Sequence, residues 1–220
     1  METVKDVRKR ILKASLRLFM TRGFARVTTQ ELSESLGISK KTLYQHFPSK
    51  DEIVLSALQA NFEGLGRRID TLFENPSLSF EYKITALLSN VGVQMSRIST
   101  VFMEDVYKHL PEAWQMIDDF RKEKVLQRLG ILLREGQEEG SIRRDIDIES
   151  VLFLVFNTVT QVLRPELLLA QGQSFPSLFN SFISLVYGGV FVPASFERLK
   201  ANMEKMQLEV LHGNETDFIE

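Results

Sequence analysis

TTQELSESLGISKKTLYQHFPSK, residues 28–50, is the stretch that decides how the N-terminal part of the chain folds. Thr28 followed by Glu31 three residues later is the pattern of a capping box, which begins a helix. Gly37 lies where a left-handed residue ends that helix, because glycine adopts a positive φ at little cost. Ser39 can then cap a second helix. Two short helices joined by a glycine turn predict a helix-turn-helix, whose second helix enters the major groove of DNA.

The second predicted helix is rich in hydrogen-bond donors. Lys40 and Lys41, in its first turn, can donate to guanine O6 and N7 or to phosphate. Thr42 can donate from its hydroxyl and offer its methyl group to thymine. Tyr44 and His46 can reach phosphate oxygens or base edges. The alternative for the two lysines and for His46 is an ordinary solvated surface.

The charge of the chain is divided unevenly along its length. Residues 1–60 hold eleven lysines and arginines against six acidic residues, a net charge of +5. The whole chain has a formal net charge of −2, so −2 − 5 leaves −7 for residues 61–220. A basic head on an acidic body is typical of a protein that approaches phosphate with one end, although a solvated surface can produce such a split by chance.

The motif TLYQHFPSK, residues 42–50, follows a helix over residues 4–22 that ends in the FxxxGF pattern of residues 19–24. Together these residues resemble the tetracycline-repressor (TetR/AcrR) family of bacterial transcription regulators. The resemblance spans roughly residues 7–58. It implies that Thr29 and Lys50 hold phosphate and that Gln30 faces DNA. With the chemistry of the second helix, the expected DNA-binding residues are Thr29, Gln30, Lys40, Lys41, Thr42, Tyr44, His46 and Lys50.

The remaining chain predicts helices only. A helix that follows Ser49 ends at Asn75-Pro76, and further helical segments cover residues 79–97, 101–110, 111–138, 145–163, 175–190 and 194–211. No alternating run flanked by hairpin turns is present. We therefore expect an all-α fold. Residues 1–50 form a three-helix helix-turn-helix domain, and residues 51–220 form a larger helical bundle that the resemblance assigns to effector binding and dimerisation.

Residues 167–196 form a stretch of thirty positions without a charged side chain. Polar residues, glycines and prolines interrupt it, so it contains no clean apolar run of the roughly 20 residues that span a bilayer. A helix buried on more than one side explains it better. The resemblance implies a two-fold interface formed by residues 148–163 and 175–190. The interface residues expected there are Leu152, Val159, Phe179, Phe182, Ile183, Val186 and Tyr187.

Aromatic and methionine side chains with a few polar groups are typical of the lining of a small-molecule site. The candidates in the body are Phe102, Met103, Tyr107, Trp114, Phe120, Phe153, Phe156, Asn157 and Gln161. Taken singly, they are more typical of an ordinary core. The resemblance implies an effector, and the lack of lysine and arginine among the candidates favours an apolar or cationic molecule over an anionic one.

Catalysis and metal chemistry find no support in the sequence. The chain has no cysteine, its three histidines are scattered, and it contains neither a nucleophile-elbow motif nor a phosphate-binding glycine loop. We expect no cofactor, no metal, no enzymatic activity and no membrane association. The expected protein is a cytoplasmic homodimer that represses transcription at a palindromic operator in double-stranded DNA until an effector releases it. The competing class is an architectural DNA-binding or protein-interaction module without an effector.

Overall fold

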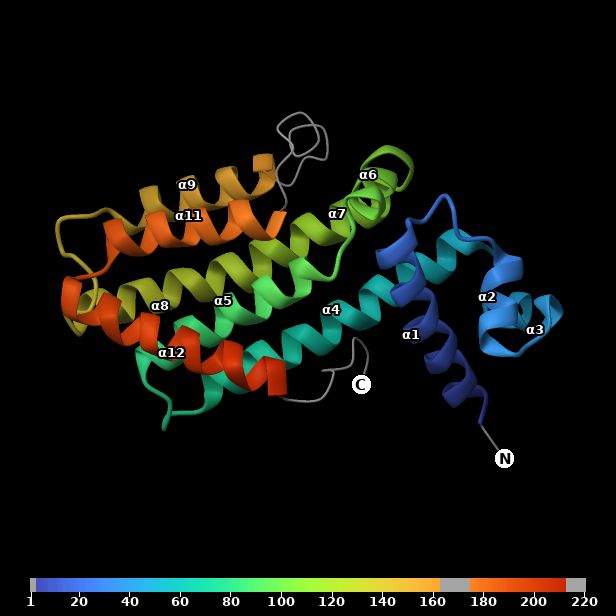
Figure 1. The fold of residues 1–220 in the computed structure, drawn as a ribbon, viewed down its shortest axis with the longest axis horizontal. Coiled ribbons are helices and arrows are strands. Elements are labelled where there is room, and N and C mark those ends of the chain that lie inside the picture. The colour runs from blue at the N-terminus through green and yellow to red at the C-terminus, as the bar shows by residue number, and fades with distance from the viewer. Residues whose placement is uncertain (1–2, 163–174, 213–220) are drawn as a thin grey trace. The chain divides into compact units, whose positions relative to one another are not determined.

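The computed structural model describes residues 3–162 and 175–212, apart from the side chains of residues 95, 96, 175, 176, 179, 180 and 203–212 (Figure 1). Helices form throughout these ranges, and the one extended pairing within them is an isolated antiparallel bridge between Ile142 and Phe191. The predicted all-α class is confirmed. None of the described helices is long and apolar enough to cross a membrane. The first residues of the predicted uncharged stretch, 167–174, lie outside the described ranges.

The described residues pack as two compact units. The first contains the chain up to Arg67 together with Arg97–Asp119, and the second contains Arg68–Ser96 and the described residues from Phe120 onward. Helix α4, Lys50–Glu74, runs without a break through Gly64 and Gly66 and contributes to both units. These packing units do not coincide with the expected boundary at residue 50, and the functional division at that residue remains a prediction.

The first unit is built on three N-terminal helices, α1 (Val4–Arg22), α2 (Thr29–Leu36) and α3 (Lys40–His46). Helix α6 (Thr100–His109) and most of α7 (Pro111–Phe120) complete it. One apolar core joins all of these helices to the first half of α4. Its fully buried side chains include Ile11, Leu16, Phe19, Leu32, Leu43, Phe47, Ile53 and Phe102.

The second unit is a bundle of longer helices. It contains α5 (Phe80–Ser96), α8 (Gln127–Glu138), α9 (Ile148–Val162), α11 (Phe175–Val190) and α12 (Pro193–His212). Figure 1 shows α9 beside α11 and α8 beside α5, with α12 running along α5. Ile84, Leu132 and Leu199 are fully buried between them. Gly136 permits the close approach of α8 to α5, because an added Cβ would lie 2.7 Å from a ring carbon of Phe80.

The helix predicted over residues 111–138 is interrupted. Between α7 and α8 the chain forms a π-helical segment, η1 (Arg121–Leu126). The carboxylate of Asp70 on α4 accepts hydrogen bonds from Lys124 of this segment at 3.1 Å and from Arg128 of α8 at 2.7 Å. Sequence periodicity did not indicate the interruption, because the apolar stripe continues on both sides of it.

Candidate nucleic-acid interface

Caps hold the helix-turn-helix in place at both ends of α2 and at the start of α3. Thr28 Oγ1 accepts a hydrogen bond from Glu31 N at 3.1 Å, and a Glu31 carboxylate oxygen accepts one from Thr28 N at 2.8 Å. The backbone hydrogen bond from Thr28 lowers the pKa of Glu31 below its usual value. Gly37 has a φ of +63°, and Ser39 Oγ accepts from Thr42 N at 3.0 Å. The predicted caps and glycine turn are confirmed.

Helix α3 has one buried and one exposed side. Leu43 and the following Phe47 have 0% and 1% of their side chains exposed, so they anchor the helix in the core. Lys40, Lys41 and Tyr44 are exposed, and Tyr44 is 48% exposed despite its large ring. The outer side of α3 therefore presents two amines and a phenol on a backbone that packing holds rigid.

The flanking candidate residues contact one another within the motif. The Tyr44 hydroxyl of α3 donates to Thr29 Oγ1 of α2 at 3.4 Å, so the structure brings these two predicted DNA contacts together. Thr42 Oγ1 lies 2.8 Å from Ser39 Oγ. The Gln30 amide donates to the carboxylate of Glu34 one turn along α2. His46 is half-buried at the end of α3.

Lys50 makes contacts that its predicted role did not include. Its Nζ donates to the carbonyl oxygens of Phe24 at 3.0 Å and Val27 at 3.1 Å, both in the connection between α1 and α2. The same amine lies 4.2 Å from the centre of the Phe24 ring, within the range of a cation–π interaction. Lys50 therefore ties the start of α4 to this connection, and its contact with phosphate remains a prediction.

Two arginines of α1 also support the motif, and the sequence did not predict their partners. Arg10 Nη1 donates to the carbonyl of Leu36 at 3.0 Å, which satisfies an otherwise open carbonyl at the end of α2. The guanidinium of Arg8 lies over the ring of Phe47, 4.6 Å from its centre. Both partners are more than twenty-five residues away, so no local pattern indicates them.

Helix α6 makes further contacts with the end of α1 and with the α1–α2 connection. Asp105 Oδ2 accepts a hydrogen bond from Ala25 N at 2.8 Å, and Ser99 N donates to the carbonyl of Met20 at 2.8 Å. Gly23, at the end of α1, has a φ of +92° and lies directly against Val101 and Asp105. The connection that leads into α2 thus contacts α1, α4 and α6.

The residues predicted to line an effector pocket are divided between the two units, and their role remains a prediction. Phe102 and Met103 are buried in the core of the first unit, where Tyr107 and Trp114 form an edge-to-face pair with ring centres 5.0 Å apart. The others belong to the second unit, and Phe153 is 67% exposed. The predicted residues of the second unit are Phe120, Phe153, Phe156, Asn157 and Gln161.

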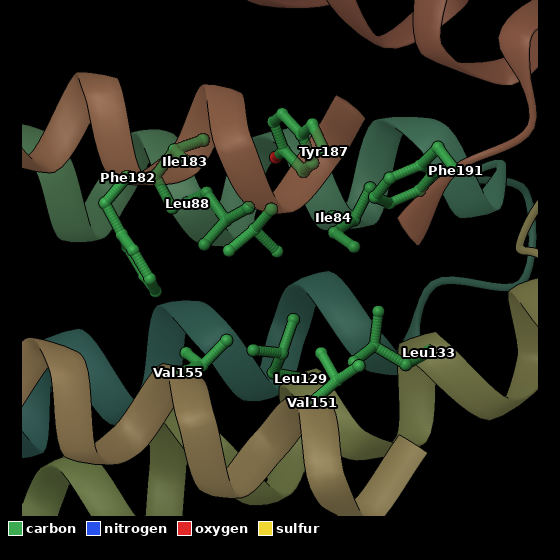
Figure 2. A pocket seen from close by; sticks show the side chains of 11 residues that line it. Ile84, Leu88, Leu129, Leu133, Val151, Val155, Phe182, Ile183, Tyr187 and Phe191 are labelled. Atoms are coloured by element: carbon green, nitrogen blue, oxygen red, sulfur yellow. The ribbon is translucent and has the colours of Figure 1, made fainter. Parts of the chain in front are cut away.

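An apolar cavity of the second unit lies between α5, α8, α9 and α11 (Figure 2). None of the nine predicted effector residues lines it. Four residues predicted for the subunit interface do so instead: Phe182, Ile183, Val186 and Tyr187. The lining residues are Ile84, Leu88, Leu129, Leu133, Val151, Val155, Phe182, Ile183, Val186, Tyr187 and Phe191.

The exposed sides of α9 and α11 carry a different set of apolar residues. Leu152, Ile183 and Tyr187 are buried within the single chain, and their assignment to a subunit interface remains a prediction. Phe153 and Leu154 of α9 are 67% and 62% exposed, and Leu185 of α11 is 76% exposed. The set Phe153, Leu154 and Leu185 is named here the outer apolar face. Val159 is half-buried, and the side chain of Phe179 is outside the described set.

Comparison with known proteins identifies similar chains. Residues 11–57 match the family model described as bacterial regulatory proteins, tetR family. The chain is 27% identical over 182 residues to the uncharacterized HTH-type transcriptional regulator YvaF of Bacillus subtilis, covering 83% of this chain and 94% of that one. It is 26% identical over 154 residues to the HTH-type transcriptional repressor KstR2 of Mycolicibacterium smegmatis, covering 69% and 75%.

The fold is also similar to solved structures. One is the crystal structure of the transcriptional regulator FadR from Bacillus subtilis in complex with stearoyl-CoA. Its TM-score is 0.57 at 19% sequence identity, and the match covers 80% of this chain and 96% of that chain.

Proposed function

The chain belongs to the tetR family of bacterial regulatory proteins, and from this premise we propose that it represses transcription by binding a palindromic operator as a homodimer. It is a DNA-binding regulator and not an enzyme. Its similarity to KstR2, which is named as a repressor, supports repression over activation. We place this activity in the cytoplasm, where bacterial DNA lies.

The observation that carries the proposal is the exposed side of α3. Lys40, Lys41 and Tyr44 project from a helix whose other side is anchored by Leu43 in the core. A recognition helix needs this combination, because donors can be matched to base edges only when their backbone is rigid. The remaining candidates Thr29 and His46 lie beside this surface and supply further contacts to the DNA backbone.

Dimerisation follows from the geometry of DNA and is supported by the outer apolar face. Two copies of a helix-turn-helix read half-sites about 34–36 Å apart. Phe153, Leu154 and Leu185 are large exposed apolar side chains on neighbouring helices, which is what a subunit interface covers. We propose that α9 and α11 meet their two-fold mates through this face and not through the buried residues first assigned to it.

We further propose that a small molecule bound in the second unit releases the protein from its operator. A ligand changes the DNA affinity only if it binds the DNA-free and DNA-bound forms with different affinity. The solved FadR structure holds stearoyl-CoA in a protein of similar fold, which supports an effector with an apolar part. The apolar cavity supports the same class, and it replaces the nine residues predicted from sequence as the proposed site.

The deciding experiment is selection of bound sequences from random duplex DNA at moderate salt. We expect one inverted repeat, and we expect Lys41→Ala to weaken binding to it. Lys200→Ala, an exposed lysine on α12, is the matched control and leaves binding unchanged. Recovery of no motif, with affinity that falls steeply as salt rises, would mean that phosphate contacts dominate. That result would favour an architectural DNA-binding module without an effector.

The interface is tested separately by sedimentation. Leu185→Arg places a charge in the outer apolar face, and we expect it to convert dimers to monomers without lowering the melting temperature of the monomer. Ile131→Arg on α8, where the wild-type side chain is 39% exposed, is the control and keeps the dimer. Dimers that persist in the first variant would place the interface elsewhere.

A further inference from the structure

Lys50 is a basic residue at the start of a helix. Ser49 Oγ accepts a hydrogen bond from Glu52 N at 3.0 Å, so Ser49 caps α4 and Lys50 is its first residue. The N-terminus of a helix is the positive end of the helix dipole, which favours an acidic side chain there and disfavours a basic one. Asp51 and Glu52 follow that rule, and Lys50 does not. Either a contact within the fold or a ligand outside it can compensate for this placement.

The Lys50 amine is enclosed by the connection between α1 and α2. It donates to the carbonyls of Phe24 at 3.0 Å and Val27 at 3.1 Å, and the Phe24 ring centre lies 4.2 Å from the nitrogen. Within the described part of the chain, no backbone N–H donates to either carbonyl, so Lys50 satisfies two acceptors that the backbone leaves open. Its side chain is half-buried, whereas Lys40 and Lys41 of α3 are exposed. The compensating contact is therefore inside the fold.

The connection that Lys50 holds leads directly into the start of α2. Val27 precedes Thr28, which caps α2, and Thr29 is the first residue of that helix. The Tyr44 hydroxyl on the outer side of α3 donates to Thr29 Oγ1 at 3.4 Å. A shift of the Val27 carbonyl would therefore move the start of α2 relative to the exposed side of α3.

An acidic residue holds the same connection at Ala25. Asp105 Oδ2 on α6 accepts a hydrogen bond from Ala25 N at 2.8 Å. The connection thus presents two carbonyls to a cation and one N–H to an anion, and each is a charge-assisted hydrogen bond of the stronger kind. Both charged side chains act on the backbone that positions α2.

We propose that Lys50 is a positioning residue for DNA binding, which holds the start of α2 in place through the α1–α2 connection and neutralises no phosphate. The resemblance of the motif implied a phosphate contact for this lysine, and the enclosed amine supports a role inside the protein instead. A phosphate contact would take the amine from two carbonyls to which no backbone N–H of the described residues donates. The inference rests on the proposed function in that DNA is the ligand.

The test separates DNA affinity from its dependence on salt. Each phosphate that a protein neutralises contributes about 0.9 to the slope of log K against log salt concentration. We expect Lys50→Met to weaken binding about tenfold, the cost of ordering roughly one loop residue on binding, and to leave the slope unchanged. Lys200→Met, which removes an exposed lysine of α12, is the matched control and changes neither quantity.

The full-length protein is titrated by fluorescence anisotropy between about 50 and 200 mM salt, at a temperature at which calorimetry shows each variant folded. The probe is the inverted repeat recovered by selection. Where selection recovers none, a random duplex of the same length takes its place, because a phosphate contact does not depend on base sequence. Failure of the operator proposal is thereby distinguished from failure of this inference.

Two results for Lys50→Met would overturn the inference. A slope that falls by about 0.9 for each Lys50 removed would show that the amine neutralises a phosphate. An unchanged affinity would show that its two hydrogen bonds serve stability alone.

A second variant decides the question if Lys50→Met does not fold. Asp105→Ala releases the connection at Ala25 and removes a negative charge, which by charge alone would strengthen DNA binding. We expect it to weaken binding instead, with an unchanged salt slope, because the start of α2 is no longer held. Binding that stays the same or becomes stronger would show that the position of the connection does not limit affinity, and would overturn the inference.

Discussion

Replacing Gly23 by alanine tests how closely α6 is packed against the end of α1. Gly23 has a φ of +92° and a ψ of 151°, a region that essentially only glycine adopts and that costs another residue about 1–3 kcal/mol. The added Cβ would also lie 2.6 Å from Val101 Cγ1 and 2.8 Å from Asp105 Oδ2. Overpacking of this kind costs about 1–3 kcal/mol. We therefore expect Gly23→Ala to lower the free energy of unfolding by roughly 2–6 kcal/mol.

The control separates backbone strain from crowding. Gly37 also has a positive φ, of +63°, but nothing lies within 4 Å of its added Cβ. Gly37→Ala should therefore cost only the left-handed penalty of about 1–2 kcal/mol. Adding Val101→Ala to Gly23→Ala should recover part of the loss, because it removes one of the two close contacts. Urea denaturation measures the free energy of unfolding of all three variants, and unchanged m-values show that the comparison is valid. Equal costs for the two glycine variants would refute the packing of α6 described above.

Three further outcomes follow from contacts in the two units. Lys50→Met removes two hydrogen bonds to backbone carbonyls and should lower the free energy of unfolding by about 1–3 kcal/mol. Lys41 is exposed, so Lys41→Met should change this free energy by less than about 0.5 kcal/mol in the same urea titration. The hydrogen bond from Arg128 holds the pKa of Asp70 below its usual value. The ionised Asp70 carboxylate therefore stabilises the folded protein fully above the unfolded pKa of about 3.9, and this stabilisation is lost as the pH falls through the folded pKa. Between pH 7 and pH 2.5 the free energy of unfolding should fall less for Asp70→Asn than for the wild type. Parallel pH profiles for the two proteins would count against the Asp70–Arg128 interaction. Gly136→Ala forces a Cβ to within 3 Å of the phenylalanine ring on α5 and should lower the melting temperature by several degrees, which calorimetry can check.

The features of the fold that the sequence predicted are those that depend on neighbours along the chain. Thr28, Gly37 and Ser39 act on residues at most five positions away, so the composition of a short window was enough to identify both helices of the motif. The periodicity of α1 and α5 likewise indicated helices near their observed bounds. These patterns are local, and the structure confirms them.

The features that the sequence did not predict depend on which side of an element meets which neighbour. In α11, Leu185 is exposed and Tyr187 is buried, yet both are large and apolar and lie two residues apart. A helix that is apolar all round has no polar side to mark the solvent, so its core and its outer face could not be told apart. The backbone contacts of Lys50 and Asp105 were not predicted for a related reason, since the partners lie 23 or more residues away and backbone groups carry no sequence signal.

The caps of α3 and its anchoring residues are separate from the residues on its outer side. Ser39 and Leu43 hold the helix in place, while Lys40 and Lys41 take no part in capping or in the core. Exposed substitutions away from such features usually change stability by less than about 0.5 kcal/mol. The side chains that we propose to contact the bases can therefore vary with almost no effect on folding. Duplicated copies of such a gene can diverge toward different operators while the scaffold stays under constant purifying selection.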